Sequence, residues 1–144
     1  NNMANSLIVG GLKTGMQVSV ACPEGYRPDS RVLDFANNYA GFSMFTEPME
    51  AASGADVIFT DVWASMGQEG EAEERKKIFG GKYQVNKELL AAANSGCMVQ
   101  HCLPAHRGEE ITADVFESHA DEIFDEAENR LHAQKAVMVT LMEK

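Results

Sequence analysis

The sequence is poor in basic residues and in long apolar runs, and each shortage argues against a class of protein. Lysine and arginine total 12 against 22 aspartate and glutamate residues, which gives a formal net charge of −10. A surface of this sign argues against nucleic acid or an anionic membrane as the main partner. No apolar run approaches the roughly 20 residues that span a bilayer, and no charged-then-apolar signal segment opens the chain.

Cysteine is also sparse, since the chain has only Cys22, Cys97 and Cys102. An odd, sparse set of this kind is typical of reduced thiols, so we expect a cytoplasmic protein. The 144 residues, 44% of them hydrophobic, are enough for one globular domain with its own core. Because the chain begins at Asn1 without an initiator methionine, we expect it to be part of a longer protein.

Short apolar runs alternate with helical patterns, and no internal repeat or low-complexity tract interrupts them. This alternation predicts a parallel sheet with helices on both faces, that is, an α/β, three-layer, doubly wound (Rossmann-like) single domain. In such sheets ligands bind beyond the carboxyl ends of the strands. Strands are expected over 18–21, 42–45, 56–60 and 97–101, and helices over 2–14, 29–40, 47–52, 87–93, 111–118 and 128–142. The glycine-containing, charged stretch 67–77 is expected to be an exposed loop and helix.

Asp61 directly follows the clearest predicted strand, and Ser65, Met66 and Gly67 come shortly after it. A carboxylate at a strand end suits an ammonium group, through a charge-assisted hydrogen bond. The alternative is that Asp61 only caps a turn. Taken alone, Trp63 and Met66 are more typical of packing than of ligand contact.

Cys102 follows the last predicted strand and has His101, His106 and Arg107 nearby. Such neighbours can lower a thiol pKa and make the side chain an acid, a base or a polar contact. The alternative is an inert, buried cysteine. A zinc site of Cys97, His101, Cys102 and His106 is the other option, but this spacing matches no common structural zinc pattern.

Two further polar positions allow a structural and a functional interpretation. Asn1 and Asn2 can cap the first helix, or their amides can face the ligand crevice. Arg130 lies where the last helix is expected to open, and it is either a solvated surface residue or a clamp for a phosphate or carboxylate.

Together these segments resemble one family, the ornithine carbamoyltransferases. Residues 61–67 resemble its Asp-x-x-x-Ser-Met-Gly loop, and residues 101–104 resemble its His-Cys-Leu-Pro motif. Asn1 and Asn2 are similar to the turn that opens the family's second domain, and residues 128–130 to its Glu-Asn-Arg segment. The order agrees over essentially the whole chain, so the resemblance implies that residues 1–144 are the ornithine-binding domain.

The resemblance implies a role for each matching residue. Asn2, Asp61, Ser65 and Met66 would hold the α-amino and α-carboxylate groups of L-ornithine. Cys102 would be the catalytic residue, and Cys102, Leu103 and Arg130 would contact carbamoyl phosphate. No metal and no organic cofactor is implied.

The family's Ser-x-Arg-Thr-Arg phosphate site has no counterpart in these 144 residues. We therefore expect the chain to need an N-terminal carbamoyl-phosphate domain as a partner, to belong to a homotrimer in the full-length enzyme, and to be inactive alone. The last helix normally packs across both domains, so its apolar residues near the end are expected to be partly exposed. The rival interpretations are a carbamoyltransferase for another amine and a non-catalytic binding domain.

Overall fold

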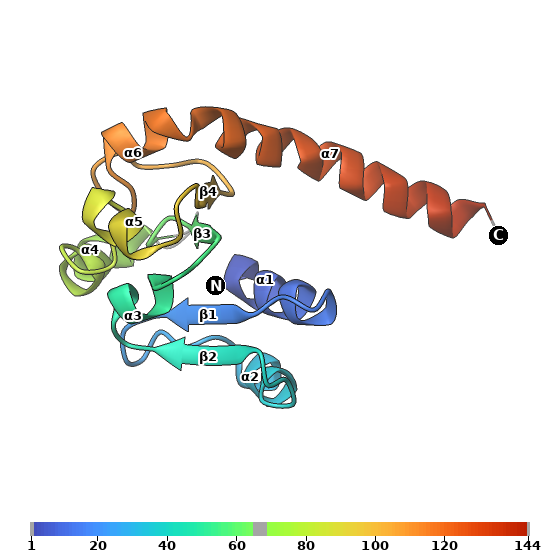
Figure 1. The fold of residues 1–144 in the computed structure, drawn as a ribbon, viewed down its shortest axis with the longest axis horizontal. Coiled ribbons are helices and arrows are strands. Elements are labelled where there is room, and N and C mark those ends of the chain that lie inside the picture. Colours follow the sequence, from blue (N-terminus) through green and yellow to red (C-terminus); the bar gives the residue numbers. More distant parts are fainter. Residues whose placement is uncertain (1, 65–68, 144) are drawn as a thin grey trace.

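The computed structural model describes residues 2–64 and 69–143, and its strands form two parallel pairs. Strand β1 (Val18–Ala21) pairs with β2 (Phe42–Phe45), and β3 (Val57–Thr60) pairs with β4 (Met98–His101). In Figure 1 the two pairs lie one above the other, with helices around them. The predicted α/β, Rossmann-like single domain is confirmed, although β1 and β3 share no ladder among the described residues.

The β1–β2 half is held together by helix α1 (Asn2–Lys13) and helix α2 (Ser30–Ala36). Ile8 and Leu12 of α1 are buried against Ala36 of α2 and against the apolar faces of both strands. Helix α1 ends at Lys13, and Gly15 follows with a φ of +84°, which is favourable for glycine. The Met16 amide donates back to the Gly11 carbonyl and closes this end of the helix. Burial of this small apolar cluster fixes the helices on their strand pair.

The β3–β4 half contains the larger core. Helix α3 (Pro48–Ala52) connects the two halves, and helix α5 (Lys87–Ala92) begins at Asn86, whose side chain accepts from the Leu89 amide at 2.9 Å. Helix α6 (Ala113–Ser118) and the first turns of α7 (Ala120–Met142) cover the other side. The buried members of this core are Ala52, Val85, Leu89, Val99, Ile111, Val115, Phe116 and Ile123.

Most predicted elements are confirmed to within one residue, and three boundaries are wrong by more than that. Helix α2 ends at Ala36 rather than at residue 40. Helix α6 begins at Ala113 rather than at 111, because Ile111 forms a β-bridge with Val85. Helix α7 begins at Ala120 rather than at 128, because Ile123 is fully buried and Glu122 accepts from the Val99 amide of β4 at 3.0 Å.

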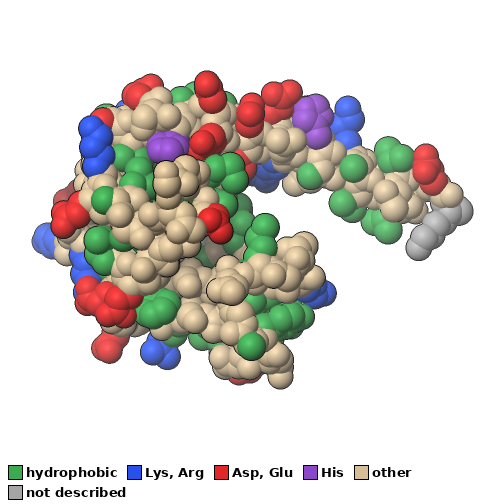
Figure 2. All heavy atoms as spheres, in the orientation of Figure 1, with side chains coloured by type: hydrophobic (Ala, Val, Ile, Leu, Met, Phe, Trp, Pro, Cys, Tyr) green, Lys and Arg blue, Asp and Glu red, His purple; other side chains and the backbone are tan. Residues whose placement is uncertain are grey.

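The second half of α7 projects away from the rest of the molecule (Figure 1). Figure 2 shows hydrophobic side chains gathered on this projecting end. They include Leu131, Val137, Met138, Val139, Leu141 and Met142, all more than half exposed. The predicted exposure of the last helix is therefore confirmed. No helix among the described residues combines the length and apolarity needed to cross a membrane.

The charged stretch after β3 contains a short 3-10 helix η1 (Glu69–Glu71) and helix α4 (Ala72–Phe79). The described part of α4 buries no residue fully, as expected for a surface helix. Residues 65–68 lie outside the described residues.

Candidate active site

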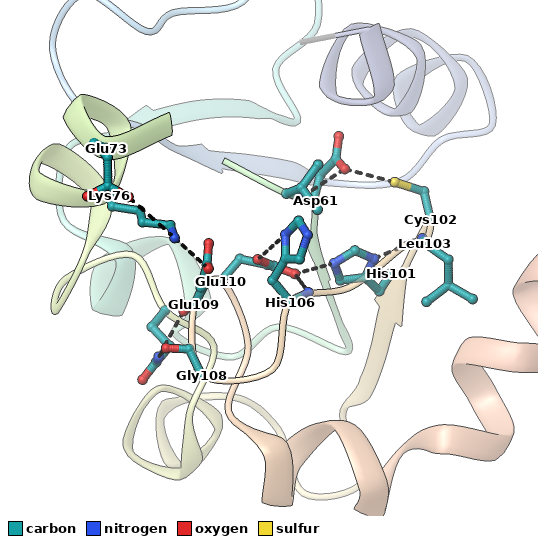
Figure 3. Close-up of polar contacts among 12 residues, drawn as sticks. Asp61, Glu73, Lys76, His101, Cys102, Leu103, His106, Gly108, Glu109 and Glu110 are labelled. Carbon is teal, nitrogen blue, oxygen red and sulfur yellow. Dashed lines mark hydrogen bonds and ion pairs between the residues drawn. The ribbon is translucent and has the colours of Figure 1, made fainter. Parts of the chain in front are cut away.

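Asp61 and Cys102 meet at the carboxyl ends of two paired strands. Thr60 and His101 are partners in the β3–β4 register, so the next residue of each strand leaves the sheet at the same edge. The Cys102 thiol donates to Asp61 Oδ1 across 3.1 Å, and the Val62 amide donates to the same oxygen at 2.8 Å (Figure 3). Asp61 and Cys102, each predicted to follow a strand, thus lie together at the edge of the sheet where ligands bind in such folds.

The surroundings of Cys102 favour the neutral thiol. Burial, the hydrogen bond to the Asp61 carboxylate and the negative charges of Asp61 and Glu126 raise the pKa of Cys102 to about 12. A protonated thiol is a weak hydrogen-bond donor rather than a nucleophile. Of the roles open to Cys102 from the sequence, the geometry therefore favours an acid or polar contact that orients Asp61.

A second carboxyl group, Glu126 of α7, lies near the same strand end. Burial raises the pKa of Glu126, only partly offset by a hydrogen bond with the His101 main chain. Its Oε2 atom is buried without a hydrogen-bond partner among the described residues. The site therefore holds two carboxyl groups, Asp61 and Glu126, whose charges both act on the Cys102 thiol.

The turn after Cys102 is tightly defined. Leu103 has a φ of +53°, the one positive value among the described residues other than glycine, and its peptide bond to Pro104 is cis. The Leu103 amide donates to Nδ1 of His101 at 2.9 Å. This bond requires a lone pair on Nδ1 and so places the ring proton of His101 on Nε2.

Glu110 anchors this turn from inside, and sequence reasoning missed it. Its carboxylate and the His101 ring are both fully buried, and Oε1 lies 3.1 Å from His101 Nε2 and 2.6 Å from the amide of His106. Burial would raise the pKa of Glu110, but these hydrogen bonds lower it below its ordinary value. The adjacent Glu109 is only half-buried, and because the two residues are identical, the sequence could not indicate which of them is the buried one.

A cleft of about 460 Å³ opens between β1 and β3, and Asp61 lies on its wall. Figure 2 shows the hollow between the two halves of the molecule. Arg75 of α4 lies beside several aromatic side chains of this wall. Its Nη1 donates to the Trp63 carbonyl at 3.1 Å, and its guanidinium lies 5.2 Å from the Tyr26 ring centroid. The aromatic members of the wall are Tyr26, Trp63, Phe79 and Tyr83. Arg75 was not predicted as a site residue because it lies in a charged run.

The remaining predicted residues lie apart from the Asp61–Cys102 pair or outside the description. Asn2 is exposed at the first described residue of α1, and its neighbours Met3 and Ala4 line the same cleft as Asp61. Ser65 and Met66 lie outside the described residues. The prediction that Arg130 opens the last helix is wrong: it is an exposed residue in the middle of α7, on the part that leaves the body.

The zinc alternative drawn from the sequence is not supported by the geometry. Within the described ranges, the group able to place three metal-ligand atoms within 4.8 Å of one another is His106, Glu109 and Glu110, and it contains no cysteine. Cys97 is buried, and its thiol donates to the Met98 carbonyl. Cys102 is committed to Asp61 instead.

The chain is similar to a well-defined set of proteins. Residues 1–141 match the family described as aspartate/ornithine carbamoyltransferase, Asp/Orn binding domain. The ornithine carbamoyltransferase of Thermococcus kodakarensis is 55% identical over 99% of this chain and 46% of its own length. The chain therefore spans about half the length of such relatives.

Solved structures give the same result. The anabolic ornithine carbamoyltransferase of Campylobacter jejuni superposes with a TM-score of 0.93 at 37% identity, over 99% of this chain and 48% of that one. The Pyrococcus furiosus ornithine carbamoyltransferase superposes with a TM-score of 0.84 at 54% identity, over 94% and 44%.

Proposed function

The chain belongs to the aspartate/ornithine carbamoyltransferase family as its Asp/Orn-binding domain, and we propose that it supplies the ornithine-binding half of an ornithine carbamoyltransferase. The proposed reaction moves the carbamoyl group of carbamoyl phosphate to the δ-amino group of L-ornithine and yields L-citrulline and phosphate, a step of the arginine-biosynthesis and urea-cycle type. The observation that carries the proposal is the Asp61–Cys102 pair at the strand ends, beside the cleft.

In this proposal Asp61 receives the α-ammonium group of ornithine. Its Oδ1 already accepts hydrogen bonds from the Cys102 thiol and the Val62 amide, which fix the direction of the carboxylate. Asn2, Ser65 and Met66 are proposed to hold the rest of the α-amino-acid end. A pre-oriented carboxylate loses little further freedom on binding an ammonium group, so the interaction favours α-amino acids over simple amines.

Chemistry would then take place at the other end of ornithine. The neutral δ-amine attacks the carbamoyl carbon, and a C–N bond forms. The bond between the carbamoyl carbon and the bridging phosphate oxygen breaks, and the proton released by the amine passes to the departing phosphate. No protein nucleophile is needed, so positioning and charge stabilisation supply the rate enhancement. Cys102, with the Leu103 main chain and Arg130, is proposed to contact carbamoyl phosphate, and Cys102 acts as a protonated donor, consistent with its raised pKa.

We further propose that the chain is inactive alone. It spans about half the length of its relatives, and it lacks the phosphate-site motif described above. An N-terminal carbamoyl-phosphate domain, a homotrimer and a cytoplasmic location belong to the same proposal. The exposed apolar end of α7 offers a surface that such a domain could cover.

The test is complementation. The chain is mixed with a separately produced carbamoyl-phosphate domain, and citrulline is assayed from ornithine and carbamoyl phosphate. We expect activity only with both pieces, and a loss of at least about 100-fold in kcat/KM for Asp61→Asn, because a partly buried charge partner of the ammonium group is removed. Asp34→Asn, the same change on an exposed residue of α2, is the matched control.

Three outcomes would redirect the proposal. Citrulline formed by the chain alone would overturn the half-site interpretation. No activity from folded, associated pieces would favour a non-catalytic binding domain. L-norvaline competing less well than simple amines would instead indicate another amine acceptor.

A further inference from the structure

The loop after β4 gathers three metal-ligand side chains outside the Asp61–Cys102 pair. His106, Glu109 and Glu110 place one ligand atom each within 4.8 Å of one another (Figure 3). The imidazole of His106 is about half exposed, and Glu109 is half-buried. The three side chains therefore line a site that a small ion can reach from solvent.

The second observation is an unpartnered oxygen of Glu110. Oε1 accepts from His101 and from the His106 amide, but Oε2 is buried and accepts no hydrogen bond from any residue that the structure describes. Oε2 faces Nδ1 of His106 at 3.9 Å, too far for a hydrogen bond. A buried carboxylate oxygen without a partner has lost its hydration and gained no hydrogen bond, so a cation beside Oε2 would be stabilising.

We propose that His106, Glu109 and Glu110 form a binding site for a divalent transition-metal cation, with Zn²⁺ the best match. Imidazole nitrogen and carboxylate oxygen are both zinc ligands, so one histidine and two glutamates supply three of the four tetrahedral positions and water supplies the fourth. Two ligand atoms at about 2.1 Å from zinc in tetrahedral geometry are about 3.4 Å apart. The 3.9 Å between Nδ1 and Oε2 therefore closes by about half an ångström, a movement that the exposed His106 ring can make.

Lys76 competes with the metal for this site. Its ammonium group lies 2.8 Å from Glu109 Oε1 and so neutralises one of the two carboxylates. A bound cation would displace this ammonium group or repel it. Removing the lysine charge should consequently tighten metal binding. A metal held by the His106 ring alone, without Glu109, would not show this gain.

The experiment is calorimetric titration of the 144-residue chain with ZnCl₂. We expect one site per chain, an affinity at least about 10-fold weaker in His106→Ala, and an affinity about 3- to 10-fold tighter in Lys76→Gln. His132→Ala is the matched control, because His132 is equally exposed and also lies beside a carboxylate, Glu128, at 3.2 Å. That variant should titrate like the unchanged chain.

A thiol site is the competing explanation, and Cys102→Ser distinguishes it. We expect the serine variant to keep its zinc affinity, and a cobalt(II) derivative of the chain to lack the near-ultraviolet charge-transfer band of a cobalt–thiolate bond. Binding that survives in His106→Ala but disappears in Cys102→Ser would overturn the proposal. So would a cobalt–thiolate band.

Discussion

The two loops that leave the β3–β4 edge are held in different ways. The loop after β4 contains its own anchor, since the buried carboxylate of Glu110 binds His101 and the His106 amide within the same segment. The described residues of the loop after β3 are held by side chains from other elements, namely the Cys102 thiol at Asp61 and Arg75 at the Trp63 carbonyl. The loop after β4 is thus preorganised, whereas the described residues after β3 depend on side chains from other elements.

This difference matters for catalysis because a site needs both fixed and adjustable parts. A loop with an internal buried anchor holds Cys102 and Leu103 at constant positions. Residues 61–64, which are fixed by part-buried contacts from other elements, can change their position at lower cost when a ligand binds. The comparison predicts that changes to Glu110 affect the stability of the whole domain, while changes to Arg75 act locally.

The largest effect is expected from Glu110→Ala. Two donors, His101 Nε2 and the His106 amide, lose their acceptor in a buried place. We expect the free energy of unfolding to fall by about 3–5 kcal/mol, measured by urea denaturation.

Glu117→Ala is the control for that variant. Glu117 accepts from Arg107 at 2.8 Å, but both side chains are at least half exposed. Its loss should cost no more than about 1 kcal/mol. An equal fall in the free energy of unfolding in both variants would show that Glu110 stabilises its loop no more than an exposed ion pair does.

The pH dependence of stability tests the charge of the same anchor. The pKa of Glu110 is lowered in the folded state, so its ionised form is stabilised by folding. The resulting stability is complete above the ordinary pKa of 4.5 and is lost as the pH falls through the lower folded value. We therefore expect Glu110→Gln to be less stable than the unchanged chain at pH 7, with the gap narrowing below about pH 4.5. A gap that stays constant from pH 7 to pH 3 would contradict this account.

Thiol reactivity tests the contact that joins the two loops. Burial and the Asp61 carboxylate raise the pKa of Cys102 to about 12, so its alkylation at pH 8 should be slow. Asp61→Asn removes the charge and the charged acceptor, and each pKa unit recovered raises the thiolate fraction about tenfold. The rate is measured with iodoacetamide in a Cys22→Ser background, since Cys22 is the other half-buried thiol. An unchanged rate would mean that burial alone controls this thiol.

Local sequence signals predicted the framework of the site well. The strands 18–21 and 42–45 are confirmed at both ends, because short apolar runs bounded by glycine or proline are self-contained signals. The caps at Asp29 and Asn86 are also confirmed, since each side chain accepts from an amide two or three residues further on. The sequence placed Asp61 and Cys102 each directly after a strand, whereas the contact between them comes from the β3–β4 register.

The contacts that sequence reasoning missed depend on partners from elsewhere in the fold. Glu109 and Glu110 are identical neighbours in sequence, yet only Glu110 turns inward, because His101 lies beneath it. The early start of α7 depends on a hydrogen bond from the Val99 amide of β4 to Glu122, and no local sequence pattern signals that contact. Arg75 sits in a charged run, and only the folded chain brings the Trp63 carbonyl to it. The resemblance to the family supplied residue roles, but not these contacts.

The smallest effect is expected from Arg75→Gln. Its contacts with the Trp63 carbonyl, Glu71 and the Tyr26 ring are partly solvated, so the free energy of unfolding should fall by only about 1 kcal/mol. The local effect should nonetheless be clear, because Trp63 is the one tryptophan of the chain and stacks on Phe79 at 6.0 Å between ring centroids. We expect acrylamide to quench Trp63 fluorescence more strongly in Arg75→Gln, whereas Lys77→Gln, two positions along α4 and exposed, should leave quenching unchanged. Equal quenching in both variants would mean that the aromatic stack holds Trp63 without Arg75, and the loop after β3 would then be more rigid than its described contacts indicate.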